Sequence, residues 1–244
     1  MKFENIIRNL SRLAAAVVIF FMAGGMYLSS KGFEWTDDGN IVLVRHAAAQ
    51  DEFIAPEIPD NYVLPDDHSI GAKTAPVTLY EYSSFGCSHC ADFHLSTVPQ
   101  LKTEFIDKGL LRLVFVPFPI DKYSMNAALL AECVDENKYF AFVDVLFKKQ
   151  REWGLARNPD KVLMQYAALS GLSQDKAELC LKNDDNAREI LSNRQNGLTQ
   201  LKIQGTPSFV LSAGGHNELI SGVRSFEAFK EMIESKLPAK HTEK

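Results

Sequence analysis

The chain has 244 residues, of which 46% are apolar and 23% are charged, and its formal net charge at pH 7 is −5. This composition argues against a largely disordered chain and suffices for one sizeable domain or a domain that carries an insertion. Because the balance is acidic and lysine and arginine are scattered, no basic surface for a phosphate backbone is expected, and nucleic acid is excluded as a partner.

The first 31 residues are typical of an export signal. Lys2, Arg8 and Arg12 precede an uncharged, mostly apolar stretch from Leu13 to Ser30. Positive charge on the N-terminal side predicts that this end stays in the cytoplasm and that the rest of the chain is exported. The stretch is intermediate in length between a secretory signal and a membrane-spanning helix. Residues 1–31 are therefore predicted to be a cleaved signal peptide or an uncleaved signal anchor; a buried helix is a weaker alternative because the stretch has no polar face.

Export places the remaining chain in the periplasm or another extracytoplasmic space, tethered to the inner membrane by its own N-terminal segment if the signal is not cleaved. Residues 32–75 are irregular and contain several prolines and acidic pairs. This pattern predicts a tether with at most one short strand, near Ile41 to Val44.

A strand-helix-strand pattern follows the tether. Val77 to Tyr82 is rich in β-forming residues and predicts a strand, which Cys87-Ser88-His89-Cys90 follows closely. Ala91 to about Asp107 predicts a helix, in which Pro99 introduces a kink. Leu111 to Val116 is nearly all apolar, as in a buried strand. This order predicts that the two strands pair in parallel through a right-handed crossover.

Residues 121–203 predict an all-helical insertion. Helical patterns occur near residues 123–133, 139–150, 159–170, 173–181 and 186–201. Beyond the insertion, Ser208 to Leu211 and Glu218 to Ser221 flank a glycine turn and predict a hairpin, and Ser225 can cap a final helix. The sequence thus predicts an α/β domain made of residues 76–120 and 204–238, interrupted once, with a tail at 239–244.

Cys87 and Cys90 are separated by two residues at a strand-to-helix junction. This spacing can hold a disulfide that opens and closes reversibly. A cysteine at the start of a helix has a lowered pKa, so Cys87 is the predicted nucleophile and Cys90, one turn further, the buried partner. His89 is expected to add a donor or positive charge near the thiolate, unless it is a solvated turn residue. As a zinc site, Cys87, Cys90 and His94 lack a fourth ligand, and His94 is expected on the helix surface.

Several motifs together resemble one family. Glu81 to Cys90, the strand at Leu111 to Val116, the helical insertion and Gly205-Thr206-Pro207-Ser208-Phe209 resemble the DsbA family of bacterial thiol-disulfide oxidoreductases over about residues 66–236. The resemblance implies a thioredoxin fold with an inserted helical domain and no bound cofactor. It also implies thiol-bearing or unfolded exported proteins as substrates and a DsbB-type membrane reductase of quinone as the partner that restores the disulfide.

The resemblance further implies roles for individual residues. Glu81 corresponds to a buried acid that exchanges a proton with the inner thiol, and Pro207 to a cis-proline that faces the dithiol beside a bound substrate strand. Ser88 stands where the family usually has proline, whereas His89 is retained. The hydroxyl of Thr206 could form a hydrogen bond near Cys87. Ser88 and Thr206 are therefore expected to set how oxidising the pair is.

The two remaining cysteines, Cys133 and Cys180, lie on inward faces of predicted helices in the insertion. In an exported protein this placement predicts a structural disulfide; the alternative is two buried free thiols.

The predicted function is therefore donation of the Cys87–Cys90 disulfide to exported proteins. Two alternatives remain open: a disulfide isomerase or reductase, suggested by Ser88 and Thr206, and a non-catalytic peptide-binding chaperone that uses the groove beside Pro207.

Overall fold

The computed structural model describes residues 33–35, 41–43, 58, 62–66 and 68–238, which fall into two units divided between Ile54 and Ala55. In the first unit, strands β1 (Phe33–Trp35) and β2 (Ile41–Leu43) pair antiparallel. β2 confirms the short strand predicted there, and β1 was not predicted. The candidate signal at 1–31 and the tail at 239–244 lie outside the described residues. Within the described ranges, no helix is long and apolar enough to cross a membrane.

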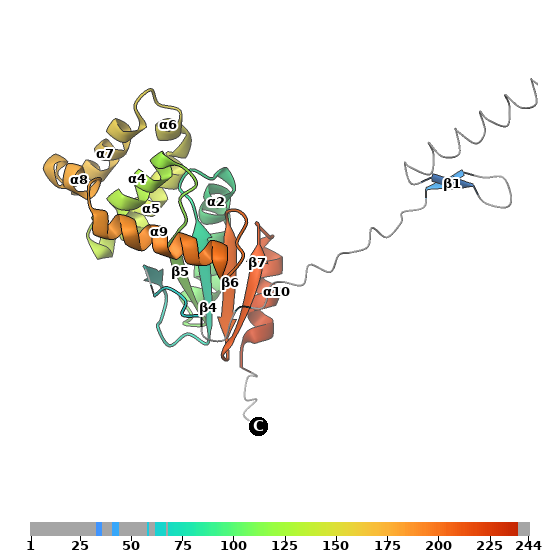
Figure 1. The fold of residues 1–244 in the computed structure, drawn as a ribbon. Coiled ribbons are helices and arrows are strands. Elements are labelled where there is room, and N and C mark those ends of the chain that lie inside the picture. Colours follow the sequence, from blue (N-terminus) through green and yellow to red (C-terminus); the bar gives the residue numbers. More distant parts are fainter. Residues whose placement is uncertain (1–32, 36–40, 44–57, 59–61, 67, 239–244) are drawn as a thin grey trace, which may run out of the picture. The chain divides into compact units, whose positions relative to one another are not determined.

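The second unit is built on a five-stranded sheet in the order β3-β5-β4-β6-β7 (Figure 1). The strands are β3 (Ser69–Ile70), β4 (Val77–Ser83), β5 (Leu111–Pro117), β6 (Ser208–Ala213) and β7 (His216–Ser221). β4 and β5 are parallel, as the strand-helix-strand pattern predicted, and the other pairs are antiparallel. The β6–β7 turn is only Gly214-Gly215, both with positive φ, so these strands are longer than predicted.

The helix after the cysteines is not uniform. It comprises α2 (Ser88–Asp92), the π-helical turn η1 (Phe93–Thr97), α3 (Val98–Leu101) and a second π-helical turn, η2 (Lys102–Ile106). Pro99 lies just beyond the first π-helical turn, at the start of α3, where a missing backbone N–H is tolerated.

The insertion is all helical over its described residues, as predicted. Its helices are α4 (Lys122–Ala131), the 3₁₀ turn η3 (Glu136–Lys138), α5 (Tyr139–Lys148), α6 (Gln150–Gly154), α7 (Pro159–Leu169), α8 (Gln174–Cys180) and α9 (Asp184–Thr199). A disulfide joins Cys180, the last residue of α8, to Cys133, which lies just after α4. α10 (Phe226–Lys236) closes the domain, and the hydroxyl of Ser225 caps it as predicted.

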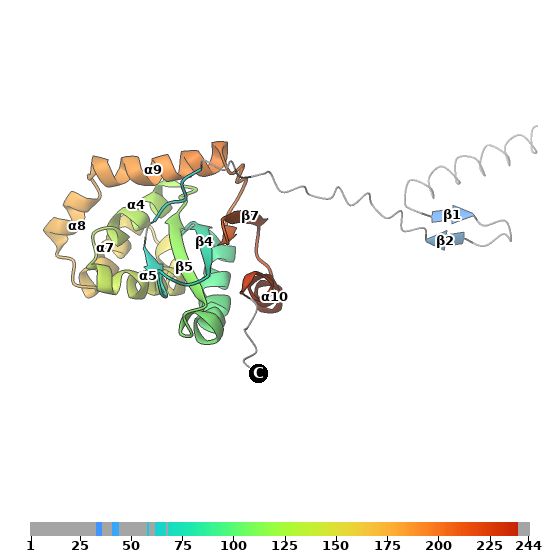
Figure 2. The same cartoon turned by 90° about the horizontal axis from the view of Figure 1, so that it is seen from below.

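The two faces of the sheet are covered by different helices, because successive side chains of a strand point to opposite faces. Figure 2 shows α9 on one face and α10 on the other. On the α10 side, the Phe93 ring lies 4.5 Å from that of Phe209 and 5.3 Å from that of Phe229, between centroids. On the α9 side, Tyr82 and Val114 are buried in a separate apolar cluster. The sheet is therefore enclosed, and its strand ends are fixed in position.

The last part of the predicted tether, 32–75, belongs to the domain instead. Tyr62 and Leu64 pack against the apolar cluster on the α9 side, and β3 pairs antiparallel with β5. Arg112 on β5 binds the carboxylate of Asp66 and, at 3.1 Å, the hydroxyl of Ser69. These contacts could not be predicted from the irregular, proline-containing sequence, because all of them are made with residues distant along the chain.

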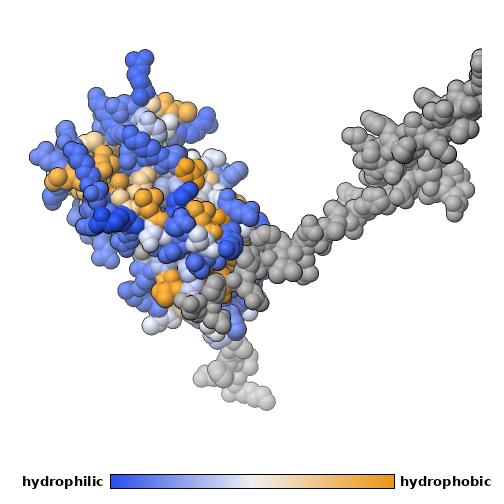
Figure 3. All heavy atoms as spheres, viewed as in Figure 1, coloured by the Kyte–Doolittle hydropathy of each residue, from blue (hydrophilic) through white to orange (hydrophobic). Residues whose placement is uncertain are grey.

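The surface is mostly hydrophilic. On the face shown in Figure 3, apolar side chains form small patches separated by hydrophilic ones. The exposed apolar residues include Leu155, Leu169 and Leu179 of the helical insertion.

Candidate active site

The two thiols stand where β4 ends and α2 begins. Cys87 is the N-cap residue of α2, and Cys90 lies in its first turn. Cys87 is half-buried, whereas the Cys90 side chain is fully buried; both are free thiols in this structure. A substrate can therefore reach only the outer sulfur, as expected for a nucleophile with a resolving partner behind it.

The helical insertion holds the loop that carries Cys87. The side-chain amide of Gln150 donates hydrogen bonds to the carbonyl oxygens of Phe85 at 2.7 Å and Cys87 at 2.8 Å. At Gly86 a Cβ atom would lie 2.7 Å from the carboxylate of Asp121, so a larger residue would displace this side chain, which caps α4. Both halves of the domain therefore position the thiols.

The environments of the two sulfurs separate their pKa values. A hydrogen bond from the Cys90 thiol, assisted by the Thr206 side chain and the backbone N–H groups of Cys90 and His89, outweighs burial and lowers the pKa of Cys87 to about 5. Burial, together with the adjacent Cys87 sulfur, raises the pKa of Cys90 far above its ordinary value. At neutral pH, Cys87 is thus a thiolate and Cys90 a neutral thiol.

A cis peptide bond joins Thr206 and Pro207 opposite the thiols. The carbonyl oxygen of Thr206 lies 3.2 Å from the Cys87 sulfur, and the Thr206 side chain contributes to lowering the Cys87 pKa. The segment that the sequence singled out for substrate binding, 119 residues further along the chain, is therefore in direct contact with the nucleophile.

The two residues between the cysteines point outward. Ser88 is exposed, and the His89 side chain is 75% exposed, with Nδ1 3.9 Å from Asp92. The contribution of His89 to the Cys87 pKa comes from its backbone N–H. The prediction that the His89 ring supplies the donor or charge is thus not supported by its contacts.

Glu81 is fully buried on β4, as the resemblance implied. The prediction that His94 lies on the helix surface is wrong: its side chain is 2% exposed. His94 Nε2 lies 2.8 Å from a carboxylate oxygen of Asp144 on α5, and Nδ1 lies 3.9 Å from Glu81. Burial acts against protonation, but the carboxylates of Asp144 and Glu81 outweigh it and raise the pKa of His94 to about 9.

A cavity of about 360 Å³ adjoins the active-site loop. Its lining includes Gly86, Tyr123, Gln150 and Leu155. Tyr123 is 39% and Leu155 79% exposed, so the cavity wall carries apolar surface next to the nucleophile.

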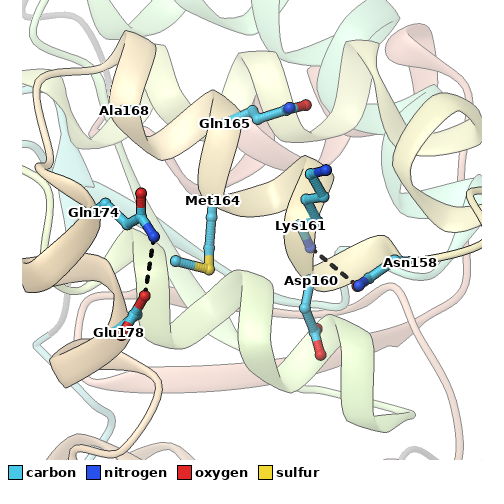
Figure 4. A pocket seen from close by; sticks show the side chains of 8 residues that line it. All are labelled: Asn158, Asp160, Lys161, Met164, Gln165, Ala168, Gln174 and Glu178. Atoms are coloured by element: carbon cyan, nitrogen blue, oxygen red, sulfur yellow. Dashed lines mark hydrogen bonds between the residues drawn. The ribbon is translucent and has the colours of Figure 1, made fainter.

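A second hollow, of about 580 Å³, is lined by residues of α7 and α8 and their flanks, among them Met164 (Figure 4). Local hydrogen bonds shape it, such as that from the Gln174 amide to Glu178 at 3.1 Å. None of its lining residues is a cysteine or comes from the active-site loop, and we assign it no part in the site.

A β-α-β unit, a helical insertion and a β-β-α unit carry a C-x-x-C dithiol at the first strand-to-helix junction and a cis-proline opposite it. These features define the class of thioredoxin-fold dithiol proteins. Residues 64–235 match the family profile described as thioredoxin. The chain therefore belongs to the thioredoxin family, and the motifs that resemble DsbA proteins lie within the matched region.

Known relatives agree with this assignment. The structure of Wolbachia pipientis alpha-DsbA1 is similar with a TM-score of 0.66 and 28% identity, covering 72% of this chain and 93% of that one. The disulfide bond formation protein D of Bacillus subtilis is 28% identical over 190 residues, 70% of this chain and 77% of that protein. A Rickettsia bellii relative named as a protein-disulfide oxidoreductase is 32% identical over 149 residues, 60% of this chain. The match spans 57% of that relative's length.

Proposed function

We propose that this chain is a thiol-disulfide oxidoreductase that donates its Cys87–Cys90 disulfide to thiol-bearing proteins. The observation that carries the proposal is the separation of the two pKa values, with that of Cys87 lowered to about 5 and that of Cys90 raised by burial. A stabilised Cys87 thiolate favours the reduced enzyme, and a stabilised reduced form makes the disulfide a stronger oxidant. The names of the relatives support the same chemistry.

The reaction follows from the geometry. A substrate thiolate attacks the half-buried but accessible Cys87 sulfur, the enzyme disulfide breaks, and its electron pair passes to Cys90. A second substrate thiolate attacks the substrate sulfur of the mixed disulfide, forms the product disulfide and releases Cys87 as a thiolate. The cavity beside Gly86 and the backbone at Thr206-Pro207 offer contacts for the substrate chain.

We further propose that the substrates are exported proteins, since residues 1–31 carry the pattern of an export signal. Each cycle leaves the enzyme as a dithiol, so an oxidant must restore the disulfide; a DsbB-type membrane reductase is the partner that the family resemblance favours.

Measurement of the reduction potential tests the direction of exchange. Equilibration with glutathione buffers is expected to give a value more positive than about −270 mV, the potential of thioredoxin. A value at or below that level would contradict the oxidase assignment and favour the reductase alternative.

Replacing Cys87 with serine tests the chaperone alternative, because it removes the nucleophile and leaves the surrounding surface intact. We expect the C87S variant to lose all turnover with a dithiol peptide. The chaperone alternative would be supported by two results together. The wild-type chain would show no exchange activity, and both it and C87S would suppress the aggregation of an unfolded protein equally well.

A further inference from the structure

Several polar atoms of β4 and of the helix that follows the cysteines are buried without a hydrogen bond of ordinary geometry. Among the described residues they include Oγ of Ser83, both carboxylate oxygens of Glu81 and Nδ1 of His94. Buried polar atoms are normally paired, and their concentration in one place calls for a functional explanation.

These atoms follow one another from the inner thiol towards the surface. The Ser83 hydroxyl lies near enough to the Cys90 thiol to lower its pKa, and Glu81, two residues earlier on β4, faces the same side of the sheet. His94 Nδ1 is 3.9 Å from Glu81, and His94 Nε2 is 2.8 Å from Asp144. The Asp144 side chain is 52% exposed, whereas those of Glu81 and His94 are 0% and 2% exposed. The series therefore begins at a buried thiol and ends at solvent.

Two charged side chains among the described residues act on His94. The groups that shift its pKa are Glu81 from β4 and Asp144 from α5. The rings of Phe115, on β5, and Phe147, on α5, also lie against the imidazole, with centroids 6.3 and 4.9 Å away. His94 is thus an isolated proton carrier between two carboxylates.

Thiol-disulfide exchange requires a proton at this place. When a thiolate attacks Cys87, the leaving sulfur of Cys90 becomes a thiolate in a site where burial strongly favours the neutral thiol. Cys90 is buried, so solvent cannot deliver that proton directly.

We propose that Glu81, His94 and Asp144 form a buried relay that carries a proton from solvent to Cys90 as the enzyme disulfide opens. This inference rests on the proposed exchange activity. The Glu81 carboxylate takes the Nδ1 proton of the His94 imidazolium and passes it towards the Cys90 sulfur. The neutral ring then turns over, so that its remaining N–H faces Glu81 and its bare nitrogen accepts a solvent proton at the Asp144 edge. One proton is taken from solvent for each Cys90 thiol formed, and no electron moves through the relay. His94 and Asp144 act as positioning residues, because they reach Cys90 only through Glu81.

The test is a single turnover of the oxidised full-length chain with excess dithiothreitol, quenched and trapped by thiol alkylation across a range of pH. For the wild type, we expect the rate constant per attacking thiolate to fall as the pH rises through about 9, where His94 loses its proton. In His94→Gln and Asp144→Asn, we expect the rate constant at neutral pH to be roughly 10- to 100-fold lower than in the wild type, which is at or below the usual effect of general acid catalysis. We also expect the decrease of the rate constant near pH 9 to disappear in both variants.

Asp107→Asn is the matched control. Asp107 is 54% exposed and paired with Lys102. Asp107→Asn therefore removes one carboxylate charge, as Asp144→Asn does, from a side chain of similar exposure that is not part of the relay. We expect this variant to keep the wild-type profile. The pKa of Cys87, followed by the absorbance of its thiolate, should change in none of the three variants if the relay acts on Cys90 alone.

A wild-type pH profile in both relay variants would overturn the inference. If His94→Gln does not fold, Asp144→Asn decides the question, because its side chain is half-exposed. A wild-type chain that does not react with dithiothreitol would contradict the proposed function rather than the relay.

Discussion

Cys87 and Cys90 are the same residue type one helical turn apart, and their surroundings make them opposite in chemistry. The outer sulfur accepts hydrogen bonds from Cys90, Thr206 and two backbone amides, whereas the inner one is buried in the apolar core of the insertion. The spacing of the motif predicted which cysteine is the nucleophile. Most of the contacts that set its pKa lie within the motif, but that of Thr206 comes from the bend that precedes β6.

The largest single cause of the low Cys87 pKa is the thiol of Cys90, which gives a first prediction. Replacing Cys90 with alanine removes this donor, whereas serine keeps a hydroxyl at the same place. We expect the pKa of Cys87 to rise in both variants, and more in Cys90→Ala than in Cys90→Ser. Thiolate absorbance across a pH titration measures it; equal values in the two variants would show that the inner side chain does not act as a donor.

Thr206 gives a second prediction at this scale. Thr206→Val removes the hydroxyl but keeps the backbone carbonyl that contacts the Cys87 sulfur. Because the Thr206 side chain lowers the pKa of Cys87, the variant should have a higher Cys87 pKa and a less oxidising disulfide. The Cys87 pKa and the reduction potential of the Cys87–Cys90 disulfide should change together. If neither changes, the Thr206 hydroxyl does not influence the redox properties of the pair.

His94 shows where reasoning from single residues failed. A polar side chain on a predicted helix was assigned to the surface, although His94 lies four residues after Cys90 and so near its buried side. Its partner Asp144 is 50 residues away, on a helix whose packing against η1 the sequence did not predict. Glu81, by contrast, was placed correctly from the resemblance, since its position relative to the cysteines is local.

At the scale of elements, the strands and most helices were predictable because their patterns are local. The π-helical turns were not, since periodicity assumes a constant 3.6 residues per turn. Leu95, an apolar residue of this helix, lies in η1 and is 36% exposed. α6 was also missed, although its first residue, Gln150, holds the active-site loop.

The disulfide between Cys133 and Cys180 links α8 to the turn after α4 across 47 residues. In the chain-entropy account, closing a loop of this length stabilises the fold by about 4 kcal/mol. We expect the double variant Cys133→Ala, Cys180→Ala to lose about 2–4 kcal/mol of unfolding free energy in urea while its Cys87 pKa stays unchanged. Thiol titration of the denatured wild type with a reduced active site should find two free thiols; four would contradict the bridge.

At the scale of the whole molecule, His94 makes stability depend on pH. Its pKa is about 9 in the folded chain against an ordinary 6.5, so the folded state holds the proton more tightly. This contribution is complete below about pH 6.5 and is lost as the pH rises through about 9; its size is on the order of 3 kcal/mol.

Urea unfolding of the oxidised protein, in which the active-site thiols do not titrate, measures this effect. We expect the wild type to lose stability between these two pH values, and His94→Gln to lose clearly less. Parallel pH dependence in the two proteins would show that His94 is not the group responsible.

The contacts of residues 62–70 have a mechanical consequence. Arg112 holds Asp66, β3 lies along β5 at the edge of the sheet, and His68 binds Glu132 at 2.9 Å while it stacks on Tyr139. A pull on the chain that precedes Tyr62 would load these contacts in shear before it reached β4, which leads into the loop and helix that carry the thiols. A force applied on the N-terminal side therefore meets these contacts first and the strand that leads to the redox centre only afterwards.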